Sequence, residues 1–371
     1  MATIYILSEH GKLTKKDETI VFVQSDETRT ILFPFKTEHL VIIGNVSISG
    51  DALRLLTKYK ICTTFLSSNG RFNGKLSFGD GKNVFLRQRQ YRILDNPSNS
   101  LELARSIVTG KIKNQISFMQ RIKRKSGAEE KIVLDAITDA KNTLNNAEKA
   151  DDIEKLRGYE GIAARQYFSV FKYNIQSEWA EFKSRSKNPP RSNVNAVLSF
   201  LYTLLMYRVE SAIESQGLDA CCGNLHAINY GKQALSFDLM EEFRTPIADS
   251  VCCSLFNLGI LVPEDFEEKK FSQDDMDYPI EGSAVPDSTE AENKGDGEES
   301  KSLEKSIKAV LLTKPGLKKV IAAFEQKMDS MILYQPTGIR ISYKKIIYEQ
   351  AEHYKRVISG EEREYKAYYF K

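Results

Sequence analysis

The sequence of 371 residues predicts an α+β protein, with a small β-rich N-terminal domain followed by a larger all-helical C-terminal domain. Up to residue 92, short β-branched or aromatic runs alternate with turn residues, a pattern typical of strands. After residue 100, apolar residues recur at helical spacing. Residues 93–100 have the proline, asparagine and serine content of a linker. We therefore expect domains at residues 1–92 and 101–371.

The N-terminal domain is predicted to hold several strands and one short helix. The predicted strands are Ile4–Leu7, Thr19–Val23, Thr30–Phe35, Leu40–Ile43 and Ile61–Leu66. Turn residues such as Gly11 separate them. Ser49 and Asp51 precede an amphipathic stretch, Ala52–Lys60, so we expect a helix there. The order of these runs predicts a β-rich domain before residue 92.

The C-terminal domain shows helical periodicity over most of its length. Its apolar sets include Leu101/Ala104/Ile107/Val108, Ile116/Met119/Ile122 and Val133/Ile137. The segment Val194–Ile213 is apolar enough to predict a buried helix. The helical pattern resumes at about Ile307 and continues to the C-terminus, with a break near Gln335–Gly338. We therefore expect an all-helical domain.

One segment of this domain has the composition of a disordered insertion. Residues 271–302 contain few apolar residues and many Asp, Glu, Ser and Gly residues. The overlapping stretch Glu264–Glu299 holds 14 acidic residues and 3 lysines, a net charge of −11. Because the whole chain carries +3, the remainder carries +14. A body that basic indicates a polyanionic partner, and an ordinary solvated surface is the alternative.

The cysteines and the apolar segments indicate in which cellular compartment the protein is found. The five cysteines, Cys62, Cys221, Cys222, Cys252 and Cys253, lack the C-x-x-C spacing of a metal or redox motif, so we expect them to be reduced. No apolar stretch follows a basic N-terminus, as it would in a signal peptide. The most apolar segment, Val197–Tyr207, is too short to span a bilayer. We therefore expect a cytoplasmic protein without membrane contact.

Two short patterns in the helical domain carry candidate functional residues. Glu160 is predicted at or near the start of a helix, between Gly158 and Gly161, which permit close approach of another backbone. His226, one of only four histidines, is predicted in a loop. Each has an ordinary structural alternative, namely a glutamate favoured by the helix dipole and a structural histidine.

A third pattern places acidic residues on one side of a predicted helix. Asp238, Glu241 and Glu242 are spaced i, i+3 and i+4, so their carboxylates converge and repel one another. Leu239 and Phe243 lie on the other side and would face the core. A bound cation would offset the repulsion. The alternative is a solvated acidic face.

Together, one histidine and several carboxylates suit a hard, octahedral divalent ion, Mg²⁺ or Mn²⁺. Such an ion can polarise a phosphodiester, activate a water or a 3′-hydroxyl, and stabilise the leaving oxygen. The basic body would hold the rest of a nucleic acid through its phosphates. We therefore interpret the three patterns as one candidate site for phosphodiester chemistry.

In this order the patterns resemble the CRISPR-associated endonuclease and integrase family Cas1. The resemblance rests on Glu160 in GYEGIAARQYF, Asn195 in NPPRSNVNAVLSFLYTLL, His226 in GNLHAINYGK, Asp238 and Glu241 in LSFDLMEEFR, and the segments Phe256–Glu267 and Lys308–Glu325. It covers essentially the whole chain, including an N-terminal part that ends near Gln88–Tyr91. Each motif alone is weak, whereas several in register are specific.

The resemblance implies an integrase that inserts short DNA fragments, called spacers, into a CRISPR array by attack of a 3′-hydroxyl on a phosphodiester. It implies Glu160, His226 and Glu241 as catalytic metal ligands, with Glu241 at a position where the family often has Asp. Asp238 falls where the family has a further catalytic acid. Glu242 competes with Glu241 for the last ligand position.

The resemblance also implies partners. They are double-stranded and branched DNA, a second copy of the chain bound through the N-terminal domain, and Cas2, a small ferredoxin-like dimer. Arg165, Lys232 and Arg244 are the predicted DNA contacts because they lie within or beside the site motifs, and pairing with local carboxylates is the alternative. The acidic insertion is longer than the family's usual connection. It is interpreted as a tolerated loop, or as a segment that repels DNA or docks a basic partner.

Two other functions fit the same residues. A divalent-metal nuclease that hydrolyses branched DNA in repair would use the same site, and only a target-joined DNA product separates it from an integrase. A non-catalytic DNA-binding scaffold would need the basic surface alone. The glutamate, histidine and acid motifs argue against the scaffold, since it has no use for them.

Overall fold

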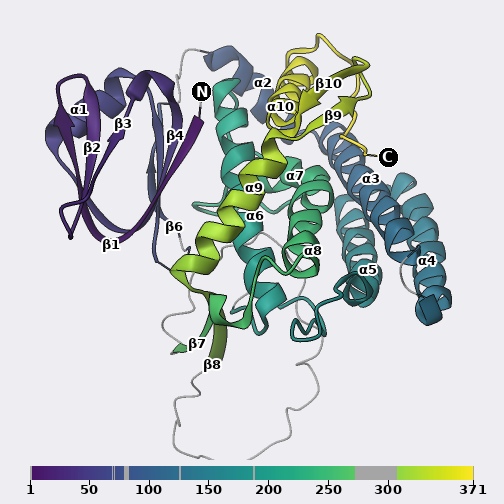
Figure 1. The fold of residues 1–371 in the computed structure, drawn as a ribbon. Helices are drawn as coiled ribbons and strands as arrows, with labels where there is room; N and C mark the ends of the chain where they lie inside the picture. The colour runs from purple at the N-terminus through teal and green to yellow at the C-terminus, as the bar shows by residue number, and fades with distance from the viewer. Residues whose placement is uncertain are drawn as a thin grey trace, which may run out of the picture. The chain divides into compact units, whose positions relative to one another are not determined.

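The structure, a computed structural model, describes residues 2–68, 70, 72–78, 83–124, 127–186, 189–271 and 307–370. The chain forms two compact units, Met1–Lys82 and Asn83–Lys371. The first is β-rich and the second is mostly helical (Figure 1). The predicted α+β class, with a β-rich part before a helical one, is confirmed.

A six-stranded sheet, in the order β3-β2-β1-β4-β5-β6, forms the N-terminal unit. Its elements are β1 (Ala2–Lys16), β2 (Thr19–Gln24), β3 (Arg29–Leu32), the 3₁₀ turn η1 (Pro34–Lys36), β4 (Thr37–Ile48), α1 (Gly50–Lys58), β5 (Cys62–Leu66) and β6 (Phe72–Leu76). β4 pairs in parallel with both β1 and β5, and the other neighbours are antiparallel. All five predicted strands and the predicted helix are present.

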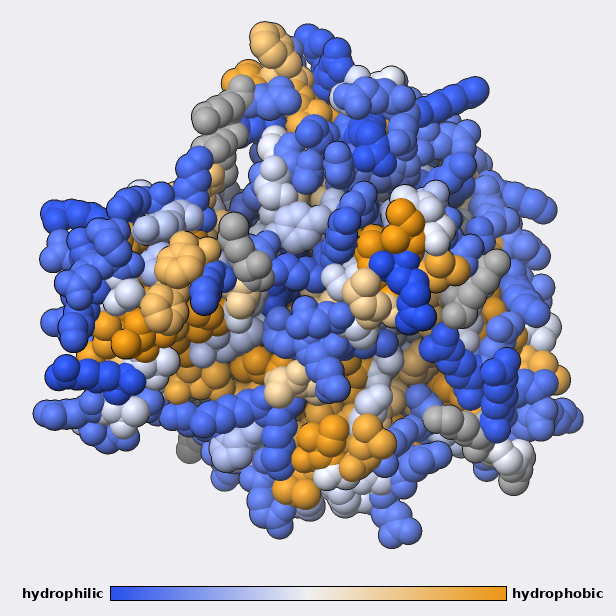
Figure 2. Space-filling model, turned by 45° about the horizontal axis from the view of Figure 1, so that its top comes forward, coloured by the Kyte–Doolittle hydropathy of each residue, from blue (hydrophilic) through white to orange (hydrophobic). Residues whose placement is uncertain are grey.

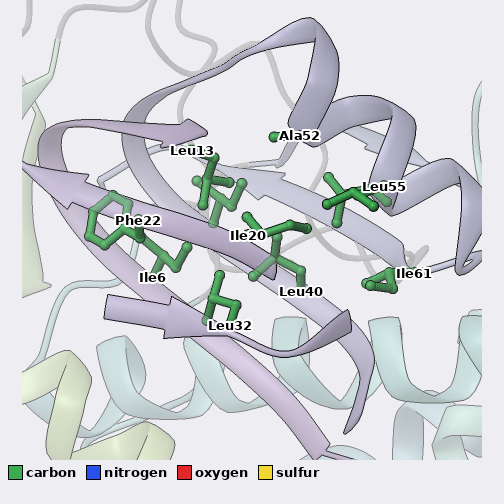
Figure 3. Close-up of a cluster of buried hydrophobic side chains, with 11 residues drawn as sticks. Ile6, Leu13, Ile20, Phe22, Leu32, Leu40, Ala52, Leu55 and Ile61 are labelled. Atoms are coloured by element: carbon green, nitrogen blue, oxygen red, sulfur yellow. The ribbon is translucent and has the colours of Figure 1, made fainter. Parts of the chain in front are cut away.

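The core of this unit lies between α1 and the sheet (Figure 3). Helix α1 begins after Ser49, whose hydroxyl accepts a hydrogen bond from the backbone N–H of Ala52 at 3.3 Å. The buried side chains are Ile6, Leu13, Ile20, Phe22, Leu32, Leu40, Ile42, Ala52, Leu55, Leu56 and Ile61. Because each large side chain stabilises the fold by roughly 1.5–3 kcal/mol when buried, this cluster is enough to organise the small unit.

Helices make up most of the C-terminal unit. Its elements are α2 (Val84–Leu94), α3 (Pro97–Lys123), η2 (Gly127–Glu129), α4 (Glu130–Glu148), α5 (Ile153–Phe171), η3 (Lys172–Asn174), α6 (Asn193–Ser215), α7 (Ala234–Phe243), the π-helical turn η4 (Arg244–Asp249), α8 (Ser250–Asn257), η5 (Pro263–Asp265), β7 (Phe266–Phe271), β8 (Ile307–Leu312), α9 (Lys314–Asp329), β9 (Met331–Tyr334), β10 (Ile339–Ser342) and α10 (Tyr343–Ser359).

Two small sheets correct the prediction that this part is all-helical. β7 pairs antiparallel with β8, and β9 with β10. The break predicted near Gln335–Gly338 is the turn between β9 and β10. Strands this short are easily assigned to the helices that flank them, because four to six residues carry too few periods to separate the two patterns.

The predicted linker at residues 93–100 also differs from the structure. Residues 84–94 form α2, which belongs to the helical unit, and Pro97 already begins α3. The side chain of Asn96 caps α3 by accepting from the backbone N–H groups of Ser98 and Asn99. Proline and asparagine are favoured at the first turn of a helix as well as in linkers, so composition alone did not distinguish the two.

Four helices of this unit position the candidate site. α7 packs against α3 and α6, and α5 packs against α3 (Figure 1). Helix α6 is long and apolar enough to pass a length-and-composition test for a membrane span, but 89% of its apolar window is buried inside the protein. Helix α6 therefore passes the test because it is a buried core helix, which has the same length and apolar composition as a membrane span.

The predicted acidic insertion lies almost wholly outside the described residues. β7 and β8, which flank it in sequence, pair along their full length from Phe266↔Leu312 to Phe271↔Ile307. All five cysteines are free thiols, as expected. On the face in Figure 2, hydrophilic side chains predominate and hydrophobic residues gather in separate patches.

Candidate active site

Glu160 lies in the middle of α5. The helix begins after Asp152, whose carboxylate accepts from the backbone N–H of Lys155 at 2.8 Å, so Glu160 is two turns inside it. The expected position at or near the helix start is therefore wrong, as is the dipole alternative attached to it. Gly158 does not serve a close backbone approach either, because an added Cβ there would meet nothing within 4 Å.

His226 lies in the loop between α6 and α7, and Asp238 in the middle of α7 holds this loop. The Asp238 carboxylate accepts from the backbone N–H groups of Asn224, Leu225 and His226. It also lies 2.7 Å from Nδ1 of the His226 ring. Because three N–H groups already donate to this carboxylate, Nδ1 acts as the fourth donor. The lone pair of His226 is then on Nε2.

Helix α7 carries the acidic residues, and every one of its side chains is buried. The predicted alternative of a solvated acidic face is therefore wrong. The expected convergence of all three carboxylates is also wrong, because Glu241 and Glu242 point in different directions. Oε1 of Glu241 lies 3.8 Å from Nε2 of His226. Successive residues differ by about 100° around a helix, so Glu242 cannot share that direction.

Glu242 belongs to a separate polar cluster. Its carboxylate accepts from the Tyr365 hydroxyl at 2.7 Å, from Gln350 Nε2 at 3.2 Å and from the backbone N–H of Tyr368. Burial is the main influence on this group and raises its pKa to about 7, although these hydrogen bonds act in the opposite direction. The geometry therefore separates Glu242 from the residues around His226.

Lys111, on α3, connects Glu160 with Glu241. Its ammonium forms an ion pair with Oε1 of Glu160 and lies 2.7 Å from Oε2 of Glu241. Its side chain is only 8% exposed. Sequence reasoning missed this residue. The available signal was its register: Lys111 continues the apolar stripe of Ile107 and Val108, where a charged side chain needs a buried partner.

The electrostatics of the cluster favour charged groups despite the burial. Burial alone would raise the pKa of Glu241, but the positive charges of Arg244 and Lys111 outweigh it and hold the pKa below its ordinary value. For Lys111, burial acts to lower the pKa, yet the carboxylates of Glu160 and Glu241 raise it overall. The carboxylates of the site therefore keep the lysine charged, and the cations keep the carboxylates charged, although all of these groups are largely buried.

The donor set fits a hard divalent ion, although it is not already arranged around one. Within the described ranges, no three His, Cys, Asp or Glu side chains surround a common point. Glu160 and Glu241 nevertheless share one cation, the Lys111 ammonium, and His226 directs Nε2 toward Glu241. Two carboxylates and an imidazole are ligands that Mg²⁺ or Mn²⁺ accepts, so the fit requires Lys111 to move.

The three predicted DNA contacts lie in different environments. Arg165 is exposed on α5 and makes no ion pair with any residue in the described part of the chain. Lys232 is half-buried, with Nζ 6.0 Å from the centre of the Phe237 ring. Arg244 is buried, lies 3.2 Å from Oε1 of Glu241 and covers the Tyr202 ring. Arg244 thus pairs with a local carboxylate, which was the stated alternative.

Solved structures share this fold. A casposase bound to its integration product superposes with a TM-score of 0.77 at 17% identity, covering 100% of this chain and 95% of that one. A Cas6-RT-Cas1–Cas2 complex superposes with a TM-score of 0.78 at 19% identity, covering 99% of this chain and 36% of that one. This fold, taken with the sequence relatives described next, defines an enzyme of the CRISPR-associated endonuclease class.

The family follows from the sequence comparisons. The model of the CRISPR associated protein Cas1 family matches residues 4–273. The CRISPR-associated endonuclease Cas1 3 of Thermus thermophilus is 31% identical over 366 residues, which cover 97% of this chain and 95% of that relative. The chain belongs to the Cas1 family, and membership implies a requirement for a divalent metal ion.

Proposed function

We propose that the protein is the integrase of CRISPR adaptation, which joins the 3′-hydroxyl of a short DNA fragment to a phosphodiester of a CRISPR array. One observation carries this proposal: inside the helical unit Lys111 pairs with both Glu160 and Glu241, and Nε2 of His226 lies 3.8 Å from Oε1 of Glu241. Membership of a family of CRISPR-associated endonucleases supports it.

Glu160, His226 and Glu241 would hold one Mg²⁺ or Mn²⁺ ion. When bound, the ion supplies Lewis-acid polarisation of the phosphodiester and charge stabilisation for the attacking and leaving oxygens. The protein's own part is to set the ligands. Asp238 holds the His226 ring through Nδ1, and Arg244 holds the Glu241 carboxylate at 3.2 Å. In this scheme Asp238 and Arg244 are positioning residues, since both are occupied by their neighbours.

DNA would be bound mainly through its phosphates, because the chain outside Glu264–Glu299 carries +14. Arg165 is the strongest candidate contact, since its side chain is exposed on the same helix as Glu160. Lys232 follows His226 in the same loop and is a second candidate. The substrates would be double-stranded and branched DNA in the cytoplasm.

Protein partners are proposed from the family. The solved complex named Cas6-RT-Cas1–Cas2 contains a chain with this fold together with Cas2, which supports Cas2 as a partner here. The β-rich N-terminal unit is the proposed homodimer contact. The two units would then divide the work, with assembly in the first and chemistry in the second.

The alternative of a purely hydrolytic repair nuclease uses the same residues and differs only in its product. The test is a plasmid integration assay with short duplex DNA, Mn²⁺ and the Cas2 protein of the same system. Wild type is compared with Glu160→Ala and with Glu130→Ala, which removes an exposed glutamate paired with Lys123. Target-joined DNA that forms with wild type and Glu130→Ala but not with Glu160→Ala supports the integrase. Cleavage without joining would favour the hydrolytic nuclease.

A further inference from the structure

Lys111 has an unusual set of neighbours for a buried lysine. Its ammonium pairs with Glu160 and lies 2.7 Å from Oε2 of Glu241. Both of these carboxylates belong to the proposed metal site. The contact joins α3 to α5 and α7, so one side chain links the three helices that carry or border the site.

The charges around this lysine show what it does for its neighbours. Glu241 has a second cation, because Nη2 of Arg244 lies 3.2 Å from its Oε1. For Glu160, the Lys111 ammonium is the single ion-pair partner found in the described part of the chain. Without Lys111, two largely buried carboxylates would face each other with no positive charge between them, an arrangement that is strongly destabilising in a protein interior.

A divalent cation would use the same oxygens. Glu160 and Glu241 cannot bind the Lys111 ammonium and a metal ion equally well at the same time, because two cations held by one pair of carboxylates repel each other. The lysine stem is flexible, and its ammonium is a compact charge that can swing away as a unit.

We propose that Lys111 is an internal counter-ion that competes with the divalent ion for Glu160 and Glu241, so that metal binding displaces its ammonium. This inference rests on the proposed function, since it assumes that these carboxylates are metal ligands. Lys111 then has two effects. It keeps the carboxylate pair assembled before the metal arrives, and it weakens metal affinity because its own ion pairs have to be broken first.

The test measures Mn²⁺ affinity directly, through the electron paramagnetic resonance signal of free Mn²⁺ in a titration of the full chain. Lys111→Met removes the competing charge and is expected to tighten Mn²⁺ binding about tenfold, a change typical of coupled sites. Lys111→Arg keeps the charge and is expected to bind no tighter than wild type. The matched control is Lys113→Met on the same helix, which removes an exposed lysine paired with Glu148 and should leave the affinity unchanged.

Thermal melting gives a second readout that does not depend on catalysis. In chelator, Lys111→Met is expected to melt below wild type, because its carboxylates lack a counter-ion. Saturating Mn²⁺ should raise its melting temperature by more than it raises that of wild type. A lysine that only fills space would give the loss in chelator without the larger gain on metal.

Three results would overturn the inference. The first is unchanged or weaker Mn²⁺ affinity in folded Lys111→Met, and the second is equal tightening in Lys113→Met. The third is failure of both Lys111→Met and Lys111→Gln to fold even with saturating Mn²⁺, since the ion then cannot replace the ammonium. Glu160→Gln separates these results from failure of the site itself. If that variant binds Mn²⁺ as wild type does, the ligand assignment fails as well.

Discussion

Nδ1 of His226 lies 2.7 Å from Oδ1 of Asp238, and the same carboxylate accepts three backbone N–H groups of the loop that carries the histidine. Asp238 therefore fixes both the path of the loop and the rotation of the ring. A carboxylate behind a metal-binding imidazole is a recurring arrangement, because it orients the ring and raises its basicity. The acid predicted as catalytic has contacts that favour a positioning role.

The first prediction concerns that contact. Asp238→Asn places an amide NH₂ among groups that donate, so at least one of the four hydrogen bonds is lost. We expect Mn²⁺ affinity and strand transfer each to fall roughly 10–100-fold. The control is Asp265→Asn, since Asp265 is also buried and accepts from the backbone N–H of Val262, but pairs with Lys319 outside the site. Equal loss of Mn²⁺ affinity in both variants would contradict a specific role for Asp238.

A second prediction separates Glu242 from Glu241. Burial raises the pKa of Glu242 to about 7, above its ordinary value of 4.5, so the folded protein takes up a proton more readily than the unfolded chain. The stability from this group is fully present below pH 4.5 and is lost as the pH rises toward 7. Glu242→Gln removes the titration, so the variant is expected to avoid a loss of roughly 3 kcal/mol in the free energy of unfolding above pH 7.

The measurement for Glu242→Gln is the free energy of unfolding in urea at several pH values between 4 and 8. Wild type should lose stability relative to the variant across this range. Mn²⁺ affinity should stay at the wild-type value, because Glu242 contacts Tyr365 and Gln350 and not His226. A large loss of Mn²⁺ affinity in this variant would show that Glu242 is a metal ligand after all.

Part of this fold was predictable because strand and helix periods are local properties. The runs around Ile20 and Leu40 alternate with turns, and they became β2 and β4 as expected. The linker predicted at residues 93–100 was wrong because Asn96 and Pro97 are equally suited to starting a helix. β9 and β10 were missed because four residues carry too few periods to override the helices beside them.

The candidate site was predictable only in part, for a different physical reason. The types and order of Glu160, His226 and Glu241 are visible in sequence, but whether they meet depends on how α3, α5 and α7 pack. Lys111 looked like an ordinary helix residue, although its position in an apolar stripe marked it as buried. The different directions of the Glu241 and Glu242 side chains became evident only when α7 proved to be buried on every side.

A third prediction separates DNA binding from the arrangement of the site. Arg165→Ala removes an exposed charge, so we expect DNA binding to weaken and the slope of log affinity against log salt to become shallower by about 1. Arg244→Met should leave that slope unchanged, because the arginine is buried against Glu241 and Tyr202. Fluorescence anisotropy with a labelled duplex across a salt series measures this slope for both variants. A shallower slope for Arg244→Met would place that residue on the DNA.

The last prediction concerns the close contact between Gly223, in the loop that carries His226, and Ala234 at the start of α7. A Cβ added at Gly223 would lie 2.6 Å from the backbone carbon of Ala234 and 2.8 Å from its Cβ, so the loop and the start of α7 would have to separate. Gly223→Ala is expected to lower the free energy of unfolding by about 1–3 kcal/mol and to weaken Mn²⁺ binding, because Asp238 loses its alignment with the loop. Gly158→Ala is the matched control, since this helical glycine faces open space, and alanine there should stabilise the protein by about 0.5–1 kcal/mol. Urea unfolding and Mn²⁺ titration of both variants make the comparison. If Gly223→Ala binds Mn²⁺ as tightly as Gly158→Ala, the close packing of loop and helix is not what positions His226.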